Sequence, residues 1–198
     1  MNFLAHCLLS FDNEALLLGN FIADDIKGKK YQDFPIDIQK GILLHREIDT
    51  FTDSHPLVKE TKILFRPVFD KFSGPLVDIF YDHLLAIHWN QYSDTPLRTF
   101  TDWAYNSLQK NIILIPEESR YFLDYVHQHD ILFAYKEKKA IIQVLNGMTE
   151  RYHSPYILSN GYPIFEENRE AIENQFAEFM PQMISHAKST IKILLGSQ

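Results

Sequence analysis

Apolar residues recur every three or four positions over most of the chain, a spacing typical of amphipathic α-helices. Seven glycines and nine prolines in 198 residues leave long windows without a helix breaker. The pattern therefore predicts an all-α fold. The expected helices cover residues 2–10, 14–27, 35–52, 56–71, 74–92, 96–110, 117–129, 135–152 and 165–194.

Turn-forming residues mark several of the expected boundaries. Gly28 suits the left-handed position that follows a helix, and Pro35 suits the start of one. Residues 154–163 are rich in Ser, Pro, Tyr and Gly and predict a loop. The short apolar run 112–115 resembles a strand, but one run without a partner makes no sheet. Without a repeat or a shift in composition, we expect a single helical domain over residues 1–198.

The first half of the chain places polar side chains on otherwise apolar helices, and these residues are spaced four apart. Residues at this spacing share one face of a helix. Each set alone suits a solvated stripe, but a buried carboxylate without a partner costs several kcal/mol, so several such sets together predict a shared site. The sets are Asn2 with His6, Asn20 with Asp24, His45 with Asp49 and Asp53, and Asp78 with Asp82, to which the adjacent His83 belongs.

The chemistry of these residue types favours a divalent metal. Imidazole nitrogens with carboxylate oxygens, and no thiolate, suit Mn²⁺, Mg²⁺, Fe²⁺ or Zn²⁺. Such a metal can lower the pKa of a bound water and neutralise charge on phosphoryl oxygens, so hydrolysis of a phosphoester is the chemistry we expect. The sequence has no GxxxxGK[ST], GxSxG or HExxH motif, which removes the usual support for a P-loop protein, a serine hydrolase or a zinc peptidase.

Net charge and cysteine content further limit the kinds of partner and the cellular location that we expect. The chain has 19 Lys and Arg against 26 Asp and Glu, a net charge of −7 that disfavours a nucleic-acid partner. The single cysteine, Cys7, can form no internal disulfide. The N-terminal segment lacks the positive charges of a signal peptide, and no apolar run reaches the ~18 residues of a membrane helix. We therefore expect a cytoplasmic protein without a membrane partner.

The segments that carry the polar sets resemble one known family. They are MNFLAH (1–6), LGNFIADDIKG (18–28), LHREIDTFTDSHP (44–56) and DIFYDHLLAIHW (78–89), and in this order they are similar to the acyl carrier protein phosphodiesterases. The resemblance implies a helical bundle like the HD-domain metal-dependent phosphohydrolases, although Asp82-His83 inverts the usual HD order. It also implies Mn²⁺ as the metal, with Mg²⁺ or Fe²⁺ as alternatives.

The implied reaction cleaves the phosphodiester between 4′-phosphopantetheine and the serine of holo acyl carrier protein. Carried onto this chain, the resemblance assigns metal or phosphate contact to Asp24, His45, Asp82 and His83. His6 and Asp49 become acid/base or orienting groups beside them, so that the expected catalytic residues are Asp24, His6, His45 and Asp49. For Asn2 and Asp53, capping or bracing a helix is an equally good interpretation.

An acidic carrier protein needs a local basic surface on a chain of net charge −7. The candidates for partner binding are Lys27, Lys29, Lys30 and Arg46, with Lys59, Lys62 and Arg66 as further members. Two other functions stay open from the sequence. One is an HD-like phosphohydrolase acting on a nucleotide or another small phosphodiester, and the other is a carrier-protein-binding module without catalysis.

Overall fold

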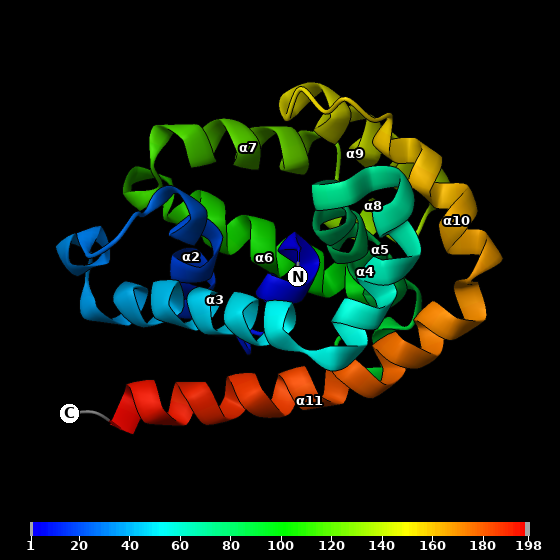
Figure 1. Ribbon diagram of the computed structural model, residues 1–198. Helices are drawn as coiled ribbons and strands as arrows, with labels where there is room; N and C mark the ends of the chain where they lie inside the picture. Colours follow the sequence, from blue (N-terminus) through cyan, green and yellow to red (C-terminus); the bar gives the residue numbers. More distant parts are fainter. Residues whose placement is uncertain (1, 197–198) are drawn as a thin grey trace.

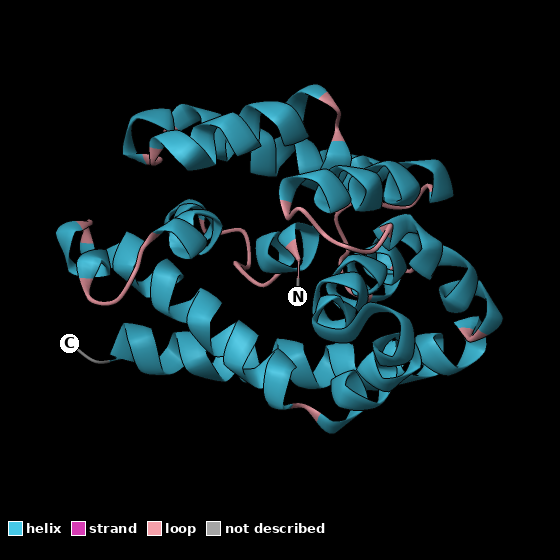
Figure 2. Ribbon diagram, turned by 45° about the horizontal axis from the view of Figure 1, so that its top comes forward, coloured by secondary structure: helices cyan, strands magenta, loops and turns pink. Residues whose placement is uncertain are grey.

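The computed structural model describes residues 2–196, and within that range every regular element is helical, so the expected all-α class is confirmed (Figures 1 and 2). The α-helices are α1 (Phe3–Leu8), α2 (Glu14–Ile22), α3 (Ile36–Ser54), α4 (Pro56–Phe69), α5 (Ser73–Ile87), α6 (Leu97–Lys110), α7 (Glu117–Gln128), α8 (Ile131–Ala134), α9 (Lys138–Arg151), α10 (Gly161–Glu167) and α11 (Arg169–Gly196). Short 3₁₀ turns connect several of them, among which η1 (Ala23–Asp25) and η2 (Lys30–Asp33) follow α2.

The C-terminal part of the chain differs from the expectation. The single helix predicted over 165–194 is wrong, because α10 begins at Gly161, inside the predicted loop, and ends before Asn168. Asn168 donates its side-chain amide to the Ile164 carbonyl at 2.9 Å and so closes the last turn of α10. Pro163 lies in the first turn of α10, where its missing N–H removes no helical hydrogen bond.

The centre of the chain also contains features that periodicity did not predict. Residues Ile112–Leu114 form a 3₁₀ turn and not a strand. The helix expected over 135–152 begins only at Lys138, and the short α8 precedes it. Gly28 has a φ of +58°, the left-handed conformation that its position after η1 required.

Helix α1 lies at the centre of the molecule, with the N-terminus beside it (Figure 1). All six of its residues are buried, which matters because an isolated helix of this length is unstable in water. The carboxylate of Asp82, on α5, fixes its first turn by accepting the backbone N–H groups of Leu4 at 2.7 Å and Ala5 at 3.2 Å. The surrounding core therefore determines where the side chains of α1 point.

Helices α2 and α3 cross at a pair of glycines. A Cβ at Gly19 would lie 2.2 Å from the Ile38 carbonyl oxygen, and a Cβ at Gly41 would lie 2.5 Å from the Leu16 carbonyl oxygen. Only glycine permits backbones this close. The close crossing brings the polar residues of α2 and α3 next to each other.

Apolar side chains from α1 to α11 form a continuous core that runs between these helices. Long helices frame it, with α11 lying alongside α3 at the edge of the molecule (Figures 1 and 2). Among residues 2–196, no helix combines the length and the apolar character needed to cross a bilayer. The single domain over residues 1–198 stays a prediction.

Candidate metal centre

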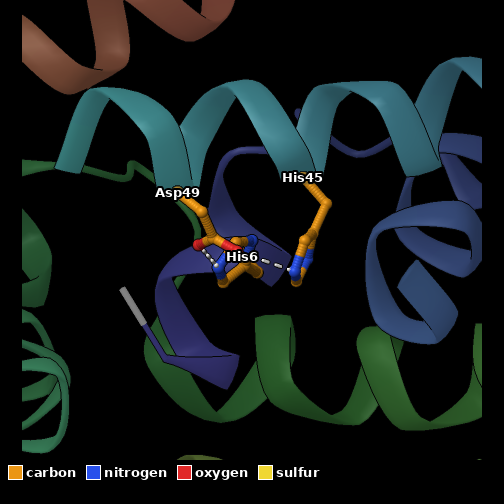
Figure 3. Close-up of side chains that lie close together, drawn as sticks. All are labelled: His6, His45 and Asp49. Atoms are coloured by element: carbon orange, nitrogen blue, oxygen red, sulfur yellow. Dashed lines mark ion pairs between the residues drawn. The ribbon is translucent and has the colours of Figure 1, made fainter. Parts of the chain in front are cut away.

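Helices α1 and α3 bring two histidines and a carboxylate together (Figure 3). His45 and Asp49 lie one turn apart on α3 and face His6 on α1. The Asp49 oxygens lie 3.2 Å from His6 Nε2 and 3.0 Å from His45 Nε2. The two imidazole rings stack, with centroids 4.2 Å apart. One potential ligand atom from each residue lies within 4.8 Å of the others.

The cluster is buried on one side and open on the other. His6 and His45 are 6% and 8% exposed, whereas the Asp49 side chain is 42% exposed. Asp24, in η1, extends the open side, since its oxygen lies 3.3 Å from His45 Nε2 and its side chain is 86% exposed. A ligand can therefore reach the carboxylates from solvent while the imidazoles stay fixed in the core.

The Nε2 atom of His45 fits a bound cation. It is a buried atom without a hydrogen-bond partner, although the Asp49 and Asp24 carboxylates lie within 3.3 Å of it. The oxygens are close but do not lie in the direction in which this nitrogen forms hydrogen bonds. His45, Asp49 and Asp24 would hold a cation here, which would give this nitrogen a partner. The donor set of imidazole nitrogen and carboxylate oxygen suits a divalent metal.

The two imidazoles have different proton affinities. Burial lowers the pKa of His45, but the Asp24 and Asp49 carboxylates outweigh this effect and raise the pKa from 6.5 to about 9. Burial also lowers the pKa of His6, and the neighbouring His45 lowers it further. Without a metal, the site therefore pairs an imidazolium at His45 with a neutral imidazole at His6.

The carboxylates of the site are ionised at neutral pH. Burial opposes ionisation of Asp49, but its contacts with His45 and His6 lower its pKa far below the usual range. The contact with His45 likewise lowers the pKa of Asp24. Two ionised carboxylates at an open mouth attract a cation and repel a phosphate, unless a cation lies between them.

Asn20, on α2, connects the two imidazoles from behind. Its side-chain oxygen lies 2.7 Å from His6 Nδ1 and 3.1 Å from His45 Nδ1. Its spacing predicted a polar set with Asp24 but no separate role for the amide. Its position in the LGN segment, four residues before Asp24, was the available signal.

The structure does not bring Asp82 and His83 into this cluster. Asp82 uses both carboxylate oxygens to hold the first turn of α1. His83 Nδ1 bonds the Tyr135 carbonyl at 2.6 Å on a different side of α5. Consecutive helical residues point about 100° apart, so these two neighbours face different surroundings. The cluster instead contains His6, Asp49 and His45, with Asp24 beside it.

The expected basic residues lie near the open side only in part. Lys27 donates to the Asp24 carbonyl, and Lys29 and Lys30 are exposed in the same loop. Arg46 donates to the Ile26 carbonyl at 2.8 Å and stacks over a tyrosine ring, so it braces this loop. The remaining candidates, Lys59, Lys62 and Arg66, belong to α4, which begins at the opposite end of α3 (Figure 1).

Comparisons with known proteins agree on one family. The family described as "Acyl carrier protein phosphodiesterase" matches residues 1–183. A protein of that name from Enterobacter sp. (strain 638) is 34% identical over 193 residues, which covers 96% of this chain and 98% of the relative. Another, from Pectobacterium atrosepticum, is 35% identical over 190 residues, with the same two coverages of 96% and 98%.

No solved structure matches the chain, so the resemblance to HD-domain proteins stays a prediction. The family match and the relatives both extend over the helices that carry the cluster. The chain belongs to the acyl carrier protein phosphodiesterase family.

Proposed function

We propose that this protein is a metal-dependent phosphodiesterase that hydrolyses the bond between 4′-phosphopantetheine and the serine of holo acyl carrier protein. The products are apo acyl carrier protein and free 4′-phosphopantetheine. The observation that carries the proposal is the cluster of His6, His45 and Asp49 in a chain of this family. The relatives are named for the same activity.

The charge of the site supports a role for the metal. A phosphodiester is an anion, and the ionised Asp49 and Asp24 would repel it from the open side. His6, His45 and Asp49 would hold a divalent cation, with Mn²⁺ as the expected one. When bound, the metal would neutralise the charge on the phosphoryl oxygens and make a water more acidic.

The buried and the exposed side chains of the site have different roles. The imidazoles of His6 and His45 lie against Asp49 on the buried side, and all three side chains would hold the metal there. Asp24 is exposed and ionised, so its carboxylate can accept a proton from an attacking water at the mouth of the site. The departing serine oxygen needs a proton, which solvent can supply at this open position.

The exposure of the site suits a substrate on the surface of another protein. A serine-linked phosphodiester on a folded carrier protein can reach Asp24, whose side chain is 86% exposed, without entry into a deep cavity. A small nucleotide would need no docking surface around the site. The exposed lysines beside Asp24 therefore favour the carrier protein over the nucleotide alternative.

The direct test follows the mass of the carrier protein. Chelator-stripped enzyme is incubated with holo acyl carrier protein, with and without added Mn²⁺, and the carrier is measured by intact mass spectrometry. We expect the phosphopantetheine mass to be lost only when metal is present. Hydrolysis of a small aryl phosphodiester, without loss from the carrier, would support the alternative substrate. No turnover of either compound would support the binding module.

Three variants test which residues are needed for turnover and for Mn²⁺ binding. Asp49→Asn should abolish turnover and weaken Mn²⁺ binding, because it removes an ionised ligand. Asp53→Asn changes the next turn of α3, where the carboxylate pairs with Lys62 at 2.8 Å, and should leave turnover unchanged. His83→Gln removes an imidazole whose Nδ1 bonds the Tyr135 carbonyl at 2.6 Å, outside the cluster, and should preserve Mn²⁺ binding. Loss of Mn²⁺ binding in His83→Gln, with binding retained in Asp49→Asn, would contradict this assignment.

A further inference from the structure

The side-chain amide of Asn20 is a buried junction between α1, α2 and the metal centre. The residue is 1% exposed. Its nitrogen donates to the His6 backbone carbonyl at 3.0 Å and to Ser10 Oγ at 3.2 Å. Its oxygen lies against His6 Nδ1 and His45 Nδ1, at 2.7 Å and 3.1 Å. Every polar atom of this amide therefore has a partner.

The partners determine which way the amide faces. A backbone carbonyl accepts hydrogen bonds and cannot donate them, so the group facing the His6 carbonyl must be the NH₂ group of Asn20. Ser10 supports this orientation, because its hydroxyl donates to the same carbonyl at 3.0 Å and so presents a lone pair to the amide. The oxygen of Asn20 is then left to face the two imidazoles.

An amide oxygen can only accept, so both Nδ1 atoms that face it must carry a proton. A neutral imidazole with its proton on Nδ1 has its lone pair on Nε2. The Nε2 atoms of His6 and His45 are the atoms that lie against Asp49. One asparagine thus specifies the same tautomer in both rings.

We propose that Asn20 is a positioning residue that fixes His6 and His45 in the Nδ1–H form, so that both Nε2 atoms are available to one divalent cation. This inference rests on the metal-dependent site proposed above. Partners of this kind behind a ligating histidine orient the ring, and their loss typically weakens metal affinity by about 10–100-fold. Asn20 differs from the usual arrangement in serving two rings with one oxygen.

The test compares metal binding in two buried-site variants. Asn20→Leu removes the acceptor but keeps the same branching and number of side-chain heavy atoms. We expect Mn²⁺ affinity, measured by electron paramagnetic resonance of free Mn²⁺, to fall about tenfold or more. Thr52→Val is the matched control. Thr52 is 1% exposed on α3 and donates to the Ile48 carbonyl at 2.8 Å, so its loss affects the fold without touching either ring. We expect Mn²⁺ affinity to stay within about twofold in that control.

Nuclear magnetic resonance measures the tautomers directly in the unaltered protein. In the Zn²⁺-loaded wild type, long-range proton–nitrogen spectra of the histidine side chains should show a proton on Nδ1 of both His6 and His45. This readout keeps the inference testable even where Asn20→Leu fails to fold. A bare Nδ1 on either ring would overturn it.

The outcomes separate the inference from the proposed function. Wild-type Mn²⁺ binding with unchanged affinity in Asn20→Leu would overturn the role of Asn20 and leave the metal site intact. Absence of Mn²⁺ binding in the wild type would overturn both the metal site and the role of Asn20. An equal loss of affinity in Thr52→Val and Asn20→Leu would show that general destabilisation, and not ring orientation, controls the metal.

Discussion

Asp82 is a buried carboxylate that stabilises the backbone of α1. Burial raises its pKa from 3.8 to about 7, although the Leu4 and Ala5 amides oppose this effect. The folded protein therefore holds a proton here between about pH 4 and pH 7 that the unfolded chain has lost. Because the folded state binds more protons in this window, the contribution of Asp82 to stability decreases as pH rises through it.

Replacing Asp82 with asparagine should remove this dependence. We expect the free energy of unfolding of Asp82→Asn, relative to wild type, to increase between pH 5 and pH 8, by on the order of 3 kcal/mol. Urea unfolding of both proteins at the two pH values, in the presence of chelator, gives the comparison. A difference between them that stays constant with pH would mean that Asp82 titrates in the same way in the folded and unfolded states.

For single residues, the sequence could predict that histidines and carboxylates form a common site. It could not predict the hydrogen-bond partner of every one of these side chains. The spacing of His45 and Asp49 fixed a common helical face, and the structure brings His6 and Asp24 to the same face. The same four-residue spacing predicted that Asp82 would belong to the site as well. Its partner is a backbone N–H pair, which has no sequence signature.

The α2–α3 crossing is the element on which the site depends, because Asn20 and His45 lie on its two sides. A Cβ at Gly41 would lie 2.5 Å from a backbone oxygen and 2.8 Å from the Gly19 Cα, so Gly41→Ala must push the helices apart. We expect a loss of about 1–3 kcal/mol in the free energy of unfolding. Weaker Mn²⁺ binding should accompany it. Urea unfolding and a Mn²⁺ titration measure the two effects.

The same substitution at Gly147 provides the control. Gly147 lies on α9, is exposed, and a Cβ there would meet nothing within 4 Å. Alanine is a better helix former than glycine by about 1 kcal/mol, so Gly147→Ala should stabilise the protein slightly. Opposite signs at the two glycines would attribute the effect to the crossing. A stabilising effect at both positions would mean that α2 and α3 tolerate separation.

Most helices could be predicted because their apolar period is local. Pro35 marked the start of α3 to within one residue, and the predicted starts of α6 and α7 lie within one residue of the observed ones. The break between α10 and α11 could not be predicted in this way. Asn168 ends α10 through a hydrogen bond to Ile164, while the apolar pattern continues on both sides of it.

Across the whole molecule, a net charge of −7 opposes the approach of an acidic partner, so productive docking requires a local cationic surface. The loop from η1 to η2 provides one candidate, at the end of α3 where the chain enters it (Figure 1). Lys29 and Lys30 are exposed there, and Lys27 contacts the backbone of Asp24 at the mouth of the site. The substrate's phosphodiester and its acidic carrier would thus meet this chain on one surface.

Reversing the charge of this loop should weaken docking and not the chemical step. We expect the double variant Lys29→Glu/Lys30→Glu to raise KM for holo acyl carrier protein by about tenfold, with kcat nearly unchanged. Added salt should reduce the difference from wild type, because it screens charges on the surface. Lys59→Glu changes an exposed position on α4, which begins at the other end of α3, so this single charge reversal is the control and should change KM little. A larger effect from Lys59→Glu than from the loop variant would place the docking surface on α4.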